Sequence, residues 1–224
     1  MSKSEARRKR AIAIFGGTFD PIHRGHLIVA RAAARRFRLD KIYFVPSSRP
    51  PHKNRQALAA FSHRYAMVAL ACAGKTRFVS SLAEAPGEAG SPRAFYSIDT
   101  VRRFRSKYPA DRIYFILGAD SFREIPIWRS YEALLDSCDF IIASRPGTRL
   151  DTLKRVIPRH MIGNQSPRDR NSIALRKSTV YLLTTVASHV SSTDIREQCR
   201  RSVSIHALVP PAVEDYIRRQ ALYR

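Results

Sequence analysis

The chain has 224 residues, a length that suits one globular domain with its own hydrophobic core. A hydrophobic fraction of 44% and a charged fraction of 26% exclude a wholly disordered protein. The 40 Lys and Arg residues outnumber 18 Asp and Glu residues, and the resulting charge of +22 favours anionic partners such as nucleic acid, an acidic membrane or polyphosphate substrates.

The excess positive charge is spread along the chain in short runs, such as Arg102-Arg103 and Arg200-Arg201. A nucleic-acid footprint clusters on one face, so this pattern favours a generally basic surface, and we expect no specific nucleic-acid partner. The three cysteines are far apart and form no C-x-x-C pair, which indicates a reducing compartment without a zinc site. No apolar stretch approaches the ~18 residues of a membrane span, so we expect a cytoplasmic protein that does not bind a membrane.

The basic residues 1–10 are interpreted as an N-terminal tail, and compact apolar runs after it predict buried strands. These runs are Ala11–Phe15, Lys41–Val45, Arg77–Leu82, Arg112–Leu117, Asp139–Ala143 and Val180–Thr184. Segments with helical spacing lie between most of them, namely Leu27–Phe37, Ser62–Ala73, Ser97–Tyr108 and Tyr131–Leu135. The alternation predicts a doubly wound α/β domain over residues 11–190, with a parallel sheet and ligands bound beyond the carboxyl ends of its strands.

The last part of the chain, residues 191–224, changes character. Helical patterns at Thr193–Arg200 and Pro211–Leu222, without a further strand, predict a C-terminal helical subdomain that packs on the α/β domain. Just before it, Pro158–Lys177 is polar and aperiodic, so we expect a long surface loop there.

The segment Gly16–His26 is the first candidate for chemistry, because it joins the first strand to the first helix. Gly16 and Gly17 lack a Cβ, which lets a nucleotide approach the backbone, and a helix N-terminus attracts phosphate. His23 and His26 are three residues apart, so both rings project from one face if the helix begins near His23. In isolation the two histidines are more often ordinary polar residues at a helix start, or half of a metal site. The strand, glycines and helix around them favour a phosphate site.

A second candidate lies at Ser191–Arg196. Its hydroxyls and the acidic Asp194 have the spacing of a capping box, which alone explains much of the pattern. The same hydroxyls, the free N–H groups of the helix and the guanidinium of Arg196 would also form a polyphosphate clamp. Spacing leaves both interpretations open.

With both segments in one chain, the sequence resembles the nucleotidyltransferase superfamily that carries an H-x-G-H motif near its start and an I-S-S-T-x-I-R motif near its end. Within it, the chain resembles the bacterial nicotinate mononucleotide adenylyltransferases over nearly its full length. Further matching segments are Val45–Lys53, Tyr96–Thr100, Leu117–Ser121, Trp128, Ser144–Gly147, Leu208–Val213, Tyr216-Ile217 and Leu222-Tyr223. Several motifs in the same order make the resemblance specific.

The resemblance implies a Rossmann-like fold and assigns roles to individual residues. His23, His26 and Arg196 would be catalytic and contact the ATP phosphates. The other ATP-binding residues would be Gly16, Gly17, Thr18, Gly118, Asp120, Ser192 and Thr193. The mononucleotide would lie against Ser47, Lys53, Tyr96, Ser97 and Trp128.

Two of these assignments have plain alternatives. On spacing alone, Lys53 is equally well a solvated loop lysine, and a single tryptophan such as Trp128 is more often a core residue. A cationic pyridinium ring nevertheless gains from an indole face. The chain departs from many relatives at Ser97, where Thr is common, and at Arg129, where an aromatic residue often follows the tryptophan. Both positions lie beside the residues that would recognise the pyridine ring.

The resemblance implies a transferase of NAD and pyridine nucleotide biosynthesis that joins AMP from ATP to nicotinate mononucleotide and releases pyrophosphate. Mg²⁺ would enter with ATP and bridge its phosphates, without a metal site formed by protein ligands. Alternatives are another H-x-G-H nucleotidyltransferase that takes phosphopantetheine or nicotinamide mononucleotide, and a basic nucleic-acid-binding module. The sequence leaves the oligomeric state open.

Overall fold

The structure is a computed structural model that describes residues 8–48, 58–86, 95–144, 148–165, 169–184 and 190–224. Seven strands form one sheet in the order β3-β2-β1-β4-β5-β7-β6. The strands are β1 (Ala11–Gly17), β2 (Lys41–Pro46), β3 (Phe78–Ser80), β4 (Arg112–Gly118), β5 (Asp139–Ala143), β6 (Ser172–Ala174) and β7 (Thr179–Leu183). All neighbouring strands pair in parallel except β6 and β7, so the predicted doubly wound α/β fold is confirmed.

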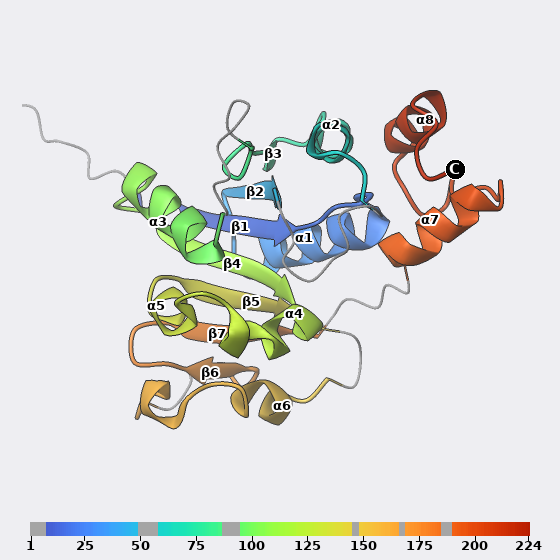
Figure 1. The fold of residues 1–224 in the computed structure, drawn as a ribbon. Coiled ribbons are helices and arrows are strands. Elements are labelled where there is room, and N and C mark those ends of the chain that lie inside the picture. The colour runs from blue at the N-terminus through green and yellow to red at the C-terminus, as the bar shows by residue number, and fades with distance from the viewer. Residues whose placement is uncertain (1–7, 49–57, 87–94, 145–147, 166–168, 185–189) are drawn as a thin grey trace, which may run out of the picture.

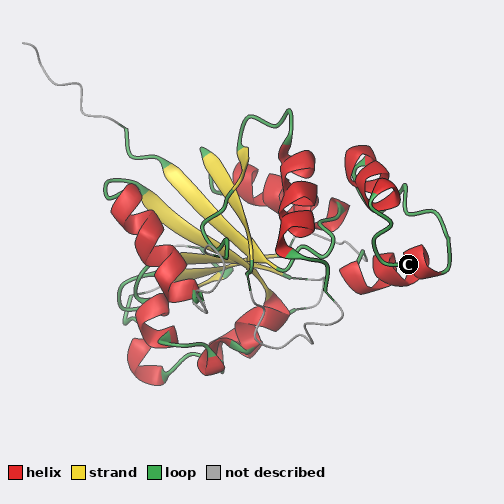
Figure 2. Ribbon diagram, turned by 45° about the horizontal axis from the view of Figure 1, so that its top comes forward, coloured by secondary structure: helices red, strands yellow, loops and turns green. Residues whose placement is uncertain are grey.

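The helices cover both faces of the sheet (Figures 1 and 2). They are α1 (Arg24–Arg36), α2 (Phe61–Cys72), α3 (Ser97–Lys107), α4 (Ala119–Arg123), α5 (Tyr131–Leu135), α6 (Leu150–Lys154), α7 (Ser192–Arg200) and α8 (Pro211–Arg219), with short 3-10 turns η2 (Ile125–Ile127) and η3 (Arg159–Met161). None of the helices in the described ranges has the length and apolar character needed to cross a bilayer.

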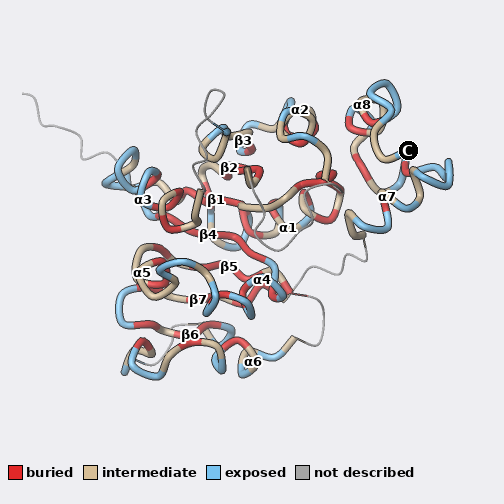
Figure 3. Tube along the Cα trace, viewed as in Figure 1, coloured by how far each residue is buried: buried red, intermediate tan, exposed pale blue. Residues whose placement is uncertain are grey.

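Alternation along the central strand β1 explains the two layers. Ala13 and Phe15 belong to a buried cluster with residues of α1, α2, α7 and α8, whereas Ile12 and Ile14 belong to a second cluster with residues of α3, α4 and α5. A strand covered on both faces is apolar at every position, which is why β1 appears in the sequence as a continuous run. Figure 3 shows this burial along the central strands.

The sheet reverses its winding at β1, which has β2 on one side and β4 on the other. At such a switch point the connections from two adjacent strands leave in opposite directions and open a crevice beyond their carboxyl ends. Here that edge carries the turn from β1 into α1 and the junction between β4 and α4.

The prediction for Pro158–Lys177 was wrong. This segment contains η3 and the strand β6, which pairs antiparallel with β7, and Ile162 forms an isolated bridge with Leu175. Met161, Ile173 and Leu175 are buried among the residues of the second cluster. Apolar residues are few in this segment, but these three pack against the sheet beside its edge strand.

The C-terminal helices pack on the face that holds α1 and α2. Ile195, Val209, Val213 and Ile217 are buried in the same cluster as Ala13 and Phe15. We propose to regard residues 191–224 as a helical subdomain of the α/β domain. Of the basic tail predicted at residues 1–10, only 8–10 lie in the described part of the chain.

Candidate active site

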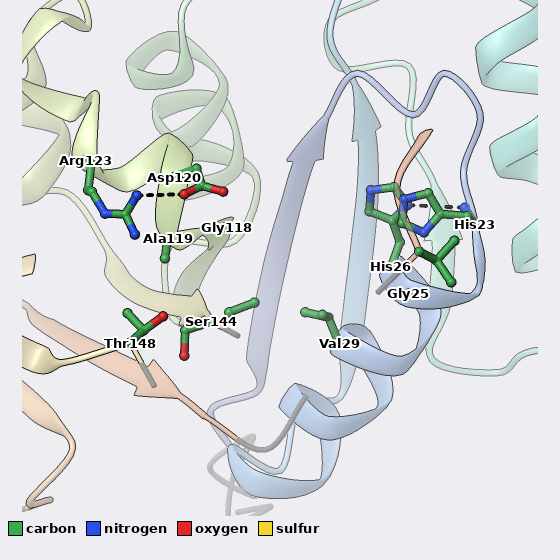
Figure 4. Close-up of a pocket in the computed structure, with 12 residues that line it drawn as sticks. His23, Gly25, His26, Val29, Gly118, Ala119, Asp120, Arg123, Ser144 and Thr148 are labelled. Carbon is green, nitrogen blue, oxygen red and sulfur yellow. Dashed lines mark hydrogen bonds and ion pairs between the residues drawn. The ribbon is translucent and has the colours of Figure 1, made fainter. Parts of the chain in front are cut away.

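A cavity of about 370 Å³ opens at the switch point of the sheet. One wall belongs to the first turns of α1, and the other to the start of α4 and to the segment that follows β5, as Figure 4 shows. Its lining residues are His23, Gly25, His26, Val29, Gly118, Ala119, Asp120, Arg123, Ala143, Ser144, Thr148 and Val190. The structure therefore brings together four residues that the sequence analysis selected, namely His23, His26, Gly118 and Asp120.

The two histidines lie against each other at the N-terminus of α1. Their ring centroids are 3.7 Å apart with an interplanar angle of 30°, and the backbone N–H of His23 donates to Nδ1 of His26 at 3.2 Å. Because Nδ1 of His26 accepts this bond, a neutral His26 ring carries its proton on Nε2. Edge contacts from Phe19 and Phe15 to the His26 ring, at centroid distances of 5.0 and 6.0 Å, fix its orientation.

His23 is the more buried of the pair, with 7% of its surface exposed. Burial disfavours the charged imidazolium and lowers the pKa of His23 from 6.5 to about 4. Among the described residues its Nδ1 is buried without a full hydrogen bond, although the ring faces the backbone N–H of His26 in a capping-box arrangement. In the unliganded protein at neutral pH, His23 is thus a neutral ring.

Gly16 and Gly17 each lie close to an aromatic ring of the core, which leaves little room for a side chain. A Cβ at Gly16 would lie 3.3 Å from the Phe115 ring, and one at Gly17 would lie 3.0 Å from the Phe19 ring. Neither glycine, nor Thr18, is among the residues that line the cavity. Aromatic packing accounts for both glycines, and their contact with a nucleotide stays a prediction.

The opposite wall begins where β4 passes into α4. Gly118 is the N-cap residue of α4, and a Cβ placed on it would meet nothing within 4 Å. The Asp120 side chain is 86% exposed, and its carboxylate accepts from Arg123 at 2.7 Å. The cavity thus contains an exposed carboxylate and an exposed guanidinium on one wall and two imidazoles on the other.

The motif at the start of α7 both caps its helix and holds the turn between β1 and α1. Ser191 is the N-cap and accepts from the N–H of Asp194 at 3.1 Å, which confirms the capping interpretation. Ser192 Oγ donates to the Pro21 carbonyl at 3.0 Å, and Arg196 donates to the Asp20 carbonyl at 2.8 Å. Thr193 is exposed.

Ser192, Thr193 and Arg196 do not line the cavity, and their predicted contacts with ATP are untested. Val190, directly before the motif, does line it. The motif therefore borders the site while its described contacts hold the turn that carries His23.

The described residues predicted for the mononucleotide, Ser47, Tyr96, Ser97 and Trp128, are not among those that line the cavity. Tyr96 and Ser97 begin α3, and Trp128 follows η2; Tyr96 and Trp128 are half-buried beside the second core cluster. The guanidinium of Arg129 stacks over the Tyr96 ring at 4.6 Å, so Arg129 joins the two segments. Ser47 donates its N–H to the Gly17 carbonyl at 2.8 Å, whereas Lys53 lies outside the described residues.

Three residues that line the cavity or hold the turn beside it were not predicted from the sequence. Arg123 and Thr148 line the cavity but belong to no recognisable motif. Arg64 is 2% exposed, and its Nη1 donates to the carbonyls of Thr18 and Ser47, both at 2.8 Å. An arginine inside an apolar helical segment was the available signal for Arg64, because a buried cation needs buried acceptors.

The described residues contain no cluster of three or more His, Cys, Asp or Glu side chains that could hold a metal ion. The cavity lining instead offers imidazole rings from His23 and His26 and a guanidinium from Arg123, groups that can donate hydrogen bonds to an anion.

Comparisons with known proteins identify the family of this chain. The cytidylyltransferase-like family model matches residues 14–198, which is most of the chain. Two relatives named probable nicotinate-nucleotide adenylyltransferase are similar over nearly their full lengths. The protein from Moorella thermoacetica is 40% identical over 97% of this chain and 93% of its own, and that from Geobacter sulfurreducens is 38% identical over 94% and 96%.

Among solved structures, the nicotinic acid mononucleotide adenylyltransferase of Plasmodium falciparum, complexed with NaAD, has a TM-score of 0.69 at 21% sequence identity. The match covers 96% of this chain and 97% of that one, and it shows that the fold is shared. Taken with the sequence relatives, these matches show that the chain belongs to the cytidylyltransferase-like nucleotidyltransferases and, within them, to the nicotinate-nucleotide adenylyltransferase family.

Proposed function

We propose that this protein transfers AMP from ATP to nicotinate mononucleotide, forming nicotinate adenine dinucleotide and pyrophosphate in NAD biosynthesis. The observation that carries the proposal is the cavity at the switch point, where His23 and His26 at the start of α1 face Gly118 and Asp120 at the start of α4. The choice of nicotinate mononucleotide as the acceptor rests on the relatives. They are named nicotinate-nucleotide adenylyltransferases, and this chain covers 93% or more of their length.

The reaction is an in-line attack of the mononucleotide phosphate on the α-phosphorus of ATP. A phosphate nucleophile is already ionised, so the step requires positioning and charge stabilisation and needs no general base. The bond from the nucleophile oxygen to the α-phosphorus forms as the bond to the bridging oxygen breaks, and pyrophosphate leaves with that electron pair.

In this proposal the imidazoles of His23 and His26 and the N-terminal N–H groups of α1 bind the polyphosphate. A neutral His23 donates from one ring nitrogen, and a bound polyanion raises its pKa because it favours the charged form. Arg196, Ser192 and Thr193 close the phosphate site from α7. Asp120, freed from Arg123, accepts from the ribose hydroxyls, while Ser47, Lys53, Tyr96, Ser97 and Trp128 bind the mononucleotide.

Mg²⁺ enters as part of the substrate in this scheme. It prefers phosphate oxygens and its own waters, so it would need no set of protein carboxylates and would supply charge neutralisation on the phosphates of ATP. We propose the cytoplasm as the location of this reaction, because the free cysteines Cys72, Cys138 and Cys199 fit a reducing compartment.

The direct test is pyrophosphate release with saturating MgATP and three acceptors in parallel: nicotinate mononucleotide, nicotinamide mononucleotide and phosphopantetheine. We expect turnover with the nicotinate compound at a kcat/KM well above that of the other two. Robust turnover with phosphopantetheine and none with either pyridine mononucleotide would refute the proposed acceptor.

A further inference from the structure

A buried carboxylate links two distant parts of the chain. One is the turn between β1 and α1, residues 18–22, here called the phosphate turn, and the other is the C-terminal segment after α8. Asp20 lies in the turn between β1 and α1 and is 1% exposed. The hydroxyl of Tyr223, 203 residues away in the sequence, donates to Asp20 Oδ1 at 2.6 Å. The only other described bond to this side chain is longer, from the N–H of Ala59 at 3.3 Å, and Asp20 Oδ2 is buried without a hydrogen-bond partner among the described residues.

The turn that contains Asp20 is held by its backbone from several other directions. Arg64 donates to the carbonyl of Thr18, Arg196 to the carbonyl of Asp20 itself, and Ser192 to the carbonyl of Pro21. Phe19 has a φ of 51°, a left-handed conformation that residues with a side chain seldom adopt. The turn is therefore a conformation imposed by its partners, and His23 follows it directly.

The position of Tyr223 is equally specific. Ala221 and Tyr223 both adopt the left-handed backbone conformation, with φ of 50° and 66°. These two residues turn the chain after α8, and the Tyr223 ring lies against the phosphate turn. Burial and the neighbouring Asp20 carboxylate raise the pKa of Tyr223, so the phenol remains protonated and is the donor.

We propose that Tyr223 is a positioning residue for adenylyl transfer: its hydroxyl fixes the Asp20 carboxylate, and with it the turn that presents His23 to the cavity. Tyr223 itself does not line the cavity and acts through Asp20. A carboxylate with one strong donor has one preferred orientation, and removal of the donor leaves it buried and largely unsatisfied. The turn then relaxes, and the imidazole of His23 loses both its burial and its alignment. This inference rests on the proposed function for its kinetic part only.

The test compares Tyr223→Phe with a matched control, Tyr216→Phe. Tyr216 also belongs to the C-terminal subdomain and its hydroxyl also crosses to another element, but its partner is Nδ1 of His63 on α2, at 2.9 Å. Each variant loses one phenolic hydroxyl from the same packed face, and only Tyr223→Phe loses a contact with the phosphate turn.

The first readout does not depend on turnover. NMR titration of the histidine ring protons, with His23 assigned from a His23→Gln variant, reports the pKa of His23 directly. We expect Tyr223→Phe to raise this pKa from about 4 toward the ordinary 6.5, and Tyr216→Phe to leave it unchanged. An unchanged His23 titration in Tyr223→Phe, or an equal change in both variants, overturns the proposal.

The second readout is kinetic. Tyr223→Phe should lower kcat about tenfold with little change in KM for the mononucleotide, as misalignment of a reacting phosphate does. Asp20→Ala should have the same effect, and the double variant should be no worse than Asp20→Ala alone, because the two residues act through one bond. If the wild-type protein is inactive with nicotinate mononucleotide, the proposed acceptor fails while the NMR titration still decides the role of Tyr223.

Discussion

At the scale of single residues, the burial of His23 determines how its imidazole acts. The ring of the unliganded protein is neutral at pH 7, so in the proposed mechanism its contribution is a directed hydrogen bond that strengthens as charge develops on the leaving phosphate. We predict that His23→Ala folds normally and lowers kcat by about two orders of magnitude, the effect of removing one preorganised donor. Steady-state pyrophosphate release measures the loss.

A histidine outside the cavity supplies the control. His160 is exposed on η3 and pairs with Glu132 at 3.3 Å. His160→Ala should retain the wild-type kcat. A His23→Ala enzyme with near-normal turnover would remove His23 from the mechanism, and an equal loss in both variants would point to instability.

The same burial gives the stability a pH dependence with a definite sign. The pKa of His23 is about 4 in the folded state and 6.5 in the unfolded chain, so between these values the unfolded chain binds a proton that the folded state does not. The free energy of unfolding therefore falls as pH is lowered from 6.5 to 4, by up to roughly 3 kcal/mol, and is unaffected by this group above 6.5.

Urea unfolding of the wild type and of His23→Gln at about pH 7.5 and about pH 5 isolates this effect, because every other group titrates in both proteins. The wild type should lose about 2 kcal/mol more than the variant on acidification. Equal losses would mean that His23 is not buried as a neutral ring.

At the scale of elements, the sequence predicts best where a segment is long and covered on both faces. The runs that became β1, β2, β4, β5 and β7 have continuous apolar interiors, since helices pack on each side of the sheet. The strand β6 and the helices α4 and α6 were not predicted, because each short element contains only one or two apolar residues and shows no period.

The candidate site likewise contains residues that a local motif predicts and residues that only long-range contacts bring together. His23 and His26 belong to one continuous motif, so their proximity follows from helical spacing. Gly118 and Asp120 reach the same cavity because parallel strands end at one edge of the sheet. Arg64 and Tyr223 act through contacts that cross long stretches of chain, which no local pattern encodes.

The edge of the sheet at β6 offers a test of the segment that the sequence analysis misjudged. Gly163 donates its N–H to the Ala174 carbonyl at 2.9 Å, and a Cβ at this position would lie 3.0 Å from the Leu175 carbonyl oxygen. Gly163→Ala forces the two backbones apart and should lower the free energy of unfolding by about 1–3 kcal/mol. Chemical denaturation followed by circular dichroism measures the change.

Gly118→Ala is the matched control, because a Cβ there meets nothing within 4 Å and the backbone conformation is open to any residue. Its free energy of unfolding should stay within about 0.5 kcal/mol of wild type. If Gly163→Ala were equally harmless, the close approach of residue 163 to Leu175 would not exist in solution.

At the scale of the whole molecule, the charge of +22 is a property that the site residues alone do not explain. Both proposed substrates are anions, and a strongly cationic protein raises their concentration near its surface. The field acts over about a Debye length, roughly 10 Å at 0.1 M salt, so added salt weakens this attraction before it disturbs the contacts inside the cavity.

This separation predicts how salt affects the kinetics. Raising NaCl from roughly 50 mM to roughly 500 mM should lower kcat/KM for nicotinate mononucleotide by about tenfold, through KM, while kcat at saturation changes little. Sodium and potassium chloride should act alike, because ionic strength is the cause. The opposite pattern, in which kcat falls and KM stays constant, would place the effect of salt on the chemical step.

A binding assay with RNA or DNA tests the alternative explanation of the charge. A nucleic-acid partner would be indicated by tight binding with a steep salt slope that is unchanged when His23 and His26 are both replaced, in a protein without turnover.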